Sequence, residues 1–149
     1  MNQTFFLLLN LALGFYNTGT IWAHEVDIFR SWQYMSQDDF HTVQEVHWRK
    51  LPYWVFIPAG LALVGALGLL LYHPVGSPVW AIWGNLLCQV LALGLTMIYW
   101  APWQARLSQD PLGPHSPYLF RILKTHWVRT ALITAYGAIL LIWALQVLT

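Results

Sequence analysis

Apolar and polar positions divide the chain into four long apolar stretches, separated by charged or turn-forming segments. A helix of about 20 apolar residues crosses a hydrocarbon core about 30 Å thick. The fourth stretch begins at Thr130 and follows directly on a short polar segment. The sequence therefore predicts four membrane-spanning helices, over residues 4–23, 51–72, 79–100 and 127–148. The first lacks a basic leader and an Ala-x-Ala cleavage site, so we interpret it as a retained helix rather than a signal peptide.

The segments between the spans carry turn and capping signals. Residues 73–78 read His-Pro-Val-Gly-Ser-Pro, which predicts a tight turn between the second and third spans. Ser36 followed by Asp39 has the spacing of a capping box, and an amphipathic pattern over residues 40–50 predicts a short helix there. Ser116 followed by Pro117 predicts an N-cap and first helical turn, from which the last helix would run to about Leu148.

These elements predict an all-α fold. We expect a single transmembrane domain over residues 1–149, an integral membrane four-helix bundle with up-down-up-down topology. Loops over residues 24–50 and 101–126 would carry the charged residues, and the short amphipathic helix would lie between the first and second spans.

Composition supports a membrane protein and excludes several other classes. Hydrophobic residues make up 58% of the chain and charged residues only 9%, too few to coat a soluble fold. The net charge of +1 offers no basic patch for a nucleic acid, and the apolar content excludes a disordered chain. A single cysteine, Cys88, excludes an intramolecular disulfide, a Cys-x-x-Cys redox pair and an all-cysteine metal site within one chain.

The few charged residues are confined to one side of the predicted membrane. All seven Lys and Arg and all six Asp and Glu lie between residues 24 and 50 or between residues 101 and 129. Under the positive-inside rule, we expect a multi-pass protein of the cell (inner) membrane with loops 24–50 and 101–126 in the cytoplasm and both termini outside. Several of the ten Trp fall near the predicted span ends, as in an interfacial aromatic belt.

Uncharged polar residues form stripes at helical spacing inside the spans. Such residues serve either as hydrogen-bonded contacts between helices or as the lining of an intramembrane pocket. Because the stripes continue toward the charged side, a pocket that opens to the cytoplasm stays in consideration. Its candidate lining residues are Asn10, Asn17, Asn85, Gln89, Thr130 and Thr134.

Five of the six histidines fall on the predicted cytoplasmic side. They are solvated or paired interfacial side chains, acid–base groups, or ligands of a metal such as zinc, iron or copper. No cofactor is required by the sequence, but a His/Glu-bound metal would draw on the following candidate ligands: His24, Glu25, His41, Glu45 and His126.

Arg129 lies about three turns into the predicted last helix, just before its most apolar part. An arginine at that depth snorkels to the surface, pairs with a carboxylate such as Glu25, Asp27 or Glu45, or holds an anionic ligand. The candidate catalytic set is therefore His41, Glu45, His126 and Arg129.

Three short motifs occur in order: Phe40-His41 before the second span, Pro102-x-x-x-x-Leu107 after the third, and Trp127-Val128-Arg129-Thr130 opening the fourth. In this order and spacing the chain resembles a bacterial family of small four-helix membrane proteins of unknown function. That family is related to the group that includes fungal anthrone oxygenases. The resemblance implies a four-helix membrane fold and, if the protein is an enzyme, an oxidoreductase or oxygenase-like activity.

Two functional hypotheses follow. In the first, the protein binds or transforms an apolar small molecule (an aromatic compound, a quinone or an isoprenoid) at a pocket on its cytoplasmic side. In the second, it is a non-enzymatic scaffold or assembly partner, with the lipid bilayer and a membrane protein or second copy as partners. The apolar spans hold no carboxylate, which disfavours an ion-coupled transporter, and no nucleophile motif suggests a soluble-substrate hydrolase.

Overall fold

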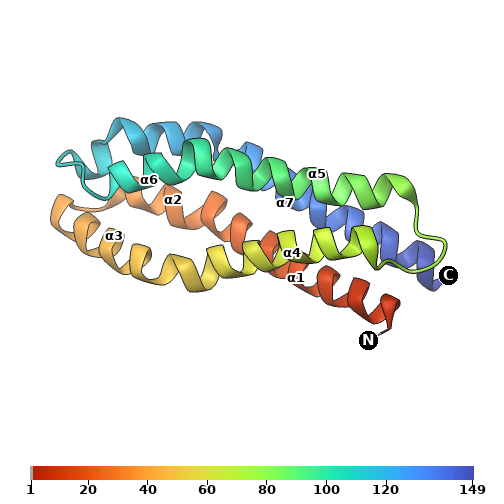
Figure 1. Cartoon of the computed structure of the whole chain (residues 1–149). Helices are drawn as coiled ribbons and strands as arrows, with labels where there is room; N and C mark the ends of the chain where they lie inside the picture. Colours follow the sequence, from red (N-terminus) through yellow and green to blue (C-terminus); the bar gives the residue numbers. More distant parts are fainter. Residues whose placement is uncertain (1) are drawn as a thin grey trace.

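A computed structural model describes residues 2–149 and shows four long helices packed side by side (Figure 1). Within that part of the chain the regular structure is entirely helical. Both termini and the turn between α4 and α5 lie at one end of the molecule, and α2, α3 and α6 lie at the other (Figure 1). The turn end is uncharged apart from the chain termini, and we call the opposite end the charged end.

Each of the first three long helices consists of α-helical segments joined by one π-helical turn. The first comprises α1 (Gln3–Ala23), a π turn (His24–Ile28), α2 (Phe29–Ser31) and a 3-10 turn (Trp32–Tyr34). The second comprises α3 (Gln37–Leu51), a π turn (Pro52–Phe56) and α4 (Ile57–Leu71). The third comprises α5 (Val79–Leu95), a π turn (Thr96–Trp100) and α6 (Ala101–Leu107). A 3-10 turn (Gly113–His115) then leads into the uninterrupted α7 (Pro117–Leu148).

Most of the predicted loops are helical extensions of the spans. The first helix continues to Tyr34, and the second begins at Gln37, so the expected short amphipathic helix is the first part of the second long helix. Similarly, the third helix continues to Leu107. The sequence-based boundaries were set where charged residues begin, but a charged residue ends an apolar run without ending a helix.

The four continuous helices contain 32, 35, 29 and 32 residues. At about 1.5 Å per residue they are about 44–53 Å long, whereas a hydrocarbon core is about 30 Å thick. By length and composition, all four are able to cross a membrane. Their excess length lies in the residues that carry the charges.

Local signals that the sequence predicts are confirmed at three places. The Ser36 hydroxyl caps α3 by accepting from the Asp39 amide at 3.2 Å. The Ser116 hydroxyl caps α7 by accepting from the Tyr118 amide at 3.1 Å. The turn between α4 and α5 includes Gly76 with φ of +83°, a left-handed conformation that glycine adopts without steric cost.

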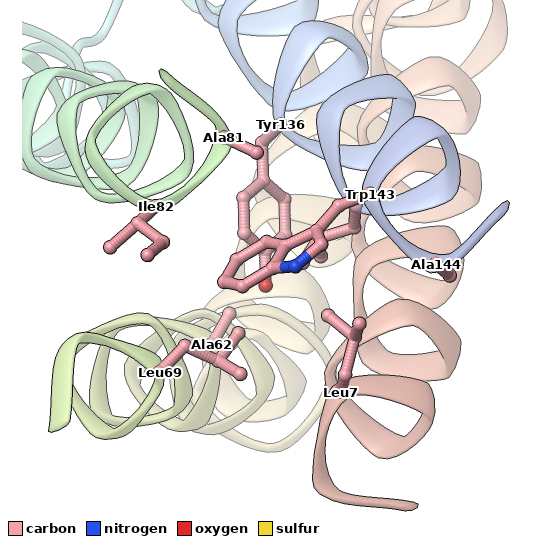
Figure 2. Packing of buried hydrophobic residues seen from close by; sticks show 9 residues of the cluster. Leu7, Ala62, Leu69, Ala81, Ile82, Tyr136, Trp143 and Ala144 are labelled. Carbon is pink, nitrogen blue, oxygen red and sulfur yellow. The ribbon is translucent and has the colours of Figure 1, made fainter. Parts of the chain in front are cut away.

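The helices form a ring in which α1 and α5 each contact both α4 and α7. Toward the turn end, an apolar cluster fills the space between them (Figure 2). Trp143 and Tyr136 of α7 lie at its centre, with Leu7 of α1 and Leu69 of α4 beside them (Figure 2). The Trp143 indole donates to the Ser77 hydroxyl at 2.9 Å, which ties α7 to the α4–α5 turn.

A second apolar cluster lies at the charged end, and it is rich in aromatic side chains. Its buried members are Phe29, Trp32, Phe40, Trp100, Leu107, Leu119 and Ile122. A glycine lets α1 and α7 approach closely between the clusters, because a Cβ on Gly137 would lie 2.8 Å from the Thr18 hydroxyl. The bundle therefore has two apolar levels, and the buried side chains between them are polar.

Candidate functional site

A layer of buried polar side chains separates the two apolar clusters. We call it the polar layer, and it comprises Asn17, His24, Glu25, Gln89, Thr96, Gln104, His126, Arg129 and Thr130. Buried polar groups are costly unless they are hydrogen-bonded, so their concentration at one level of an apolar bundle marks the place where function is expected.

The three π turns lie at this level. One contains His24 and Glu25, another contains Thr96 and Trp100, and the third contributes Val55 to cavities beside Arg129. A π turn inserts one residue into a helix and turns the side chains on either side, and such turns occur often at functional sites. Pro52 begins one of these turns, and its missing N–H favours a departure from the α-helical pattern.

A chain of three side chains crosses the polar layer. His126 Nδ1 lies 2.8 Å from Glu25 Oε2, and the Arg129 Nε and Nη2 atoms lie 3.2 Å and 2.5 Å from His126 Nε2. Because an arginine can only donate, His126 Nε2 must accept, which leaves the proton on Nδ1 to donate to Glu25. Phe29 packs edge-on against the His126 ring, with centroids 4.7 Å apart.

Glu25 also binds an arginine, Arg30. Arg30 Nη2 donates to Glu25 Oε1 at 2.8 Å, and Arg30 Nε donates to the Glu25 carbonyl at 2.9 Å. The single carboxylate therefore contacts Arg30 on one oxygen and His126 on the other.

In the described structure no carboxylate pairs with Arg129. Its side chain is almost fully buried, at 7% exposed. Its Nη1 donates to the Thr96 hydroxyl at 3.4 Å, and its guanidinium carbon lies 5.3 Å from the centre of the Trp100 ring. Across residues 2–149, no acidic oxygen lies within 4.0 Å of this guanidinium. With His126 neutral, the group formed by Glu25, Arg30 and Arg129 carries one excess positive charge.

Two further histidines meet beside this network. His24 Nδ1 donates to the Thr20 carbonyl at 2.7 Å, which leaves its Nε2 as an acceptor, and that buried atom has no hydrogen-bond partner in the described structure. The His47 ring lies 5.5 Å from the His24 ring. Gln104 Nε2 donates to His47 Nε2 at 3.0 Å, so α6 holds the His47 ring in place.

An apolar groove of about 430 Å³ runs between the first and second long helices at these histidines. His24 and His47 line it together with the indoles of Trp32 and Trp54, and Lys50 also borders it. The remaining lining is mainly aliphatic: Ile28, Thr42, Val43, Val46, Leu51 and Val55. A groove of this size and composition is typical of small-molecule sites.

Two smaller cavities, of about 30 and 40 Å³, lie inside the bundle next to Arg129. Arg129, Asn17 and Thr96 line both. The first also touches His24 and Gln104, and it shares His24, Leu51 and Val55 with the groove. We call the pair the inner cavity; it adjoins the apolar groove at His24.

The structure divides the candidate catalytic residues into two groups. His126 and Arg129 are buried in the polar layer. His41 and Glu45 are exposed on α3, where Glu45 pairs with Arg49 at 2.7 Å and its side chain is 73% exposed. The four residues therefore do not converge on one site.

The candidate lining residues are also divided. Asn17 and Gln89 line the inner cavity. Thr130 and Thr134 line a separate groove on the outer face of α1 and α7. Asn10 lies against Gly65 of α4, and Asn85 is buried without a hydrogen-bond partner in the described structure.

The five candidate metal ligands do not form a metal centre. His41 and Glu45 are exposed, whereas His24, Glu25 and His126 are buried. Both ring nitrogens of His126 have partners, and one of these is the Arg129 cation, which would repel a metal ion. Within residues 2–149, no group of three or more His, Cys, Asp or Glu side chains is arranged to hold a metal.

Sequence reasoning overlooked His47, Gln104 and Trp100 as members of a site. Their spacing along the chain carries no motif, because they come together only when α3, α6 and α7 pack. Gln104 lies within the predicted loop 101–126, and no signal in the sequence marks it as buried.

No family model, curated protein or solved structure matches the chain.

Proposed function

We propose that this chain is an integral membrane protein whose four helices cross the bilayer in up-down-up-down order, with the charged end in the cytoplasm. The length and apolarity of the helices and the confinement of every Lys and Arg to one end support this arrangement. Arg129 is 19 residues from Leu148, or about 28 Å along α7 at about 1.5 Å per residue. The polar layer would then lie where the hydrocarbon core meets the cytoplasmic headgroups.

Cysteine labelling in intact cells tests the orientation. In a Cys88→Ser background, Val75→Cys places a thiol in the turn between α4 and α5, and Gln109→Cys places one in the turn before α7. A membrane-impermeant maleimide should label the first variant in intact cells and the second only after permeabilisation. The opposite pattern would mean an inverted orientation.

The function that we propose is binding of an apolar small molecule in the groove at His24 and His47. The observation that supports it best is the groove itself, about 430 Å³ in volume and lined by aliphatic side chains, two indoles and two imidazoles. The imidazoles supply polar contacts that orient a bound ring or chain, and the apolar walls remove its surface from water. Aromatic compounds, quinones and isoprenoids have this chemistry, and oxygenase activity remains a prediction from the family resemblance.

A binding assay with matched variants tests this proposal. Purified protein in uncharged detergent is titrated with decylubiquinone, farnesol and naphthalene, with native mass spectrometry as the readout. Val46→Phe narrows the groove and should weaken binding about tenfold, whereas Val26→Phe, at an exposed position outside the groove, should not. Equal binding by both variants, or no binding by the wild type, would contradict the proposal.

A scaffold role is the second candidate, and one surface favours it. A groove of about 560 Å³ on the outer face of α1 and α7 lies between Trp22 and Trp127. Its floor contains Ala131, Ala135 and Ala138, small residues of the kind that admit a neighbouring helix. Native mass spectrometry distinguishes the candidates, because a stoichiometric protein subunit supports the scaffold and a small molecule supports the binding site.

A further inference from the structure

The Arg129 guanidinium is the part of the polar layer whose charge is least compensated. It is buried, its hydrogen bonds go to a neutral imidazole and a hydroxyl, and the nearby carboxylate of Glu25 already binds Arg30 and His126. A buried charge without a counter-charge is strongly unfavourable, so this arrangement favours an anion in contact with Arg129.

The inner cavity provides the space for such an anion. Arg129 and Asn17 line both of its compartments, and the amide of Gln104 lines the first. Asn17 Nδ2 lies 3.4 Å from the Pro58 carbonyl, a long contact that leaves the amide able to donate elsewhere. Its two compartments, of about 30 and 40 Å³, are much smaller than the groove of about 430 Å³, so a small acidic group suits them better than a bulky one.

His24 supplies a second and different requirement. Its Nε2 is an acceptor that lacks a donor, and the residue lies between the inner cavity and the groove. A carboxylate meets both requirements. One oxygen accepts from Arg129 and offsets its charge, and His24 donates to the other oxygen once its Nε2 takes up a proton from water. An alcohol has one oxygen and no charge, so it neither offsets the charge of Arg129 nor accepts from both side chains.

From these observations we propose that the ligand is a long-chain carboxylate. Its carboxyl group enters the inner cavity and binds Arg129 and His24, while its hydrocarbon chain occupies the apolar groove past Leu51 and Val55. This inference rests on the proposed binding function and adds the chemical class of the ligand. It also gives a reason for the chain to keep an arginine at the inner edge of an apolar span.

Three probes of simple structure test it: decanoate, 1-decanol and acetate, each titrated into the full chain in uncharged detergent. Occupancy is read by native mass spectrometry, and tryptophan fluorescence serves as a second readout because Trp100 lies beside Arg129. Decanoate should bind at least about tenfold more tightly than decanol, because a charge-assisted hydrogen bond replaces a neutral one. Acetate should bind weakly, since it lacks the chain.

Substitutions then test whether the tighter binding of decanoate than of decanol depends on the inner cavity. Arg129→Gln should reduce decanoate binding to the level of decanol, and Arg49→Gln, at an exposed cation of α3 outside the groove, should leave the preference intact. Because Arg129→Gln alters a buried network, Ala59→Leu provides an independent test: it adds volume to the wall of the inner cavity and leaves Arg129 unsubstituted. Its control is Ala12→Leu, on an exposed face of α1.

Each outcome has a distinct meaning. Preference for decanoate that is lost in Arg129→Gln and Ala59→Leu supports the proposal. Equal binding of decanoate and decanol overturns it while leaving the groove as a binding site. Acetate that binds as tightly as decanoate overturns it in favour of a small-anion site, and an absence of binding by both long-chain probes overturns the proposed function as well.

Discussion

Glu25 and His126 lie 101 positions apart in the chain, and they are joined by a buried contact of 2.8 Å between Oε2 and Nδ1. The contact links the π turn after α1 to the first third of α7. It also fixes which ring nitrogen carries the proton, because Arg129 occupies the other.

We therefore expect neutral His126 to be the Nδ1–H tautomer. The two nitrogens of a histidine have distinct ¹⁵N chemical shifts, so NMR of histidine-labelled protein measures the tautomer directly. His126→Asn identifies the signal by its disappearance. An Nε2–H tautomer would contradict the hydrogen-bond scheme of the polar layer.

Loss of the Glu25 carboxylate should destabilise the bundle. Glu25→Gln removes the anion that binds Arg30 and His126, and removal of one member of a buried ionic network costs about 3 kcal/mol. The exposed pair between Glu45 and Arg49 provides the control, since Glu45→Gln should change the free energy of unfolding by less than about 0.5 kcal/mol. Denaturant unfolding in detergent, followed by circular dichroism, compares the two variants. Equal effects would show that Glu25 is not part of a structural network.

Two glycines of α4 should respond oppositely to alanine. A Cβ on Gly65 would lie 1.8 Å from Asn10 Oδ1, whereas a Cβ on Gly60 would meet nothing within 4 Å. Gly65→Ala should destabilise the protein by about 1–3 kcal/mol through overpacking. Gly60→Ala should be neutral or stabilise it by up to about 1 kcal/mol, because alanine favours a helix. Thermal unfolding curves of the two variants provide the measurement, and a stabilised Gly65→Ala would contradict this packing of α1 on α4.

Tyr16 and Pro58 should be energetically coupled. Pro58 has no N–H to donate to the carbonyl four residues earlier, that of Trp54, and the Tyr16 hydroxyl donates to this carbonyl at 3.2 Å. Tyr16→Phe should therefore cost about 1 kcal/mol in the wild type and less in a Pro58→Ala background, where a backbone donor is restored. A double-mutant cycle on unfolding free energies measures the difference. Strict additivity would mean that the hydroxyl does not replace the missing donor.

The start of α7 should depend on pH through Asp110. The Leu112 amide and the Ser116 hydroxyl donate to its carboxylate, at 3.0 Å and 2.7 Å, and they lower its pKa from the ordinary value of 3.8. Because the folded pKa is the lower one, this stabilisation is complete above the unfolded value and is lost as the pH falls through the folded value. Wild-type protein should lose more stability than Asp110→Asn when the pH is lowered from about 5 to about 3.

Unfolding temperatures at the two pH values test this difference. Asp27→Asn, which removes the same charge from an exposed position, is the control and should follow the wild type. An identical pH response of Asp110→Asn and the wild type would contradict a role for Asp110 in holding the Ser116 cap.

Features that depend on neighbours in the sequence were predictable, and features that depend on packing were not. The caps at Ser36 and Ser116 and the full extent of α7 follow from local patterns, and the structure confirms them. Arg129 and His126 were recognisable because a charged or ionisable group at the edge of an apolar run is costly. A charged residue beside an apolar run can be recognised from the sequence without knowledge of the fold.

By contrast, His41 and Glu45 share a helical face, and their spacing suggested joint chemistry, but that face of α3 is exposed. His47, six positions after His41, instead faces His24. The π turns also escaped prediction: the one at His24–Ile28 contains no proline, and none of its residues signals the wider turn. A π turn changes which side of a helix the following residues face. A sequence pattern that assumes a regular α-helix therefore assigns those residues to the wrong face.

The contact between Glu25 and His126 also has a consequence for how the protein is made. The first helix is synthesised long before the last, so Glu25 at first has only Arg30 as its counter-charge. His126 and Arg129 lie on the last helix, so the two halves of the polar layer meet only after α7 has been made. A nascent chain without α7 would therefore leave the buried face of α1 uncovered and its polar side chains without their partners.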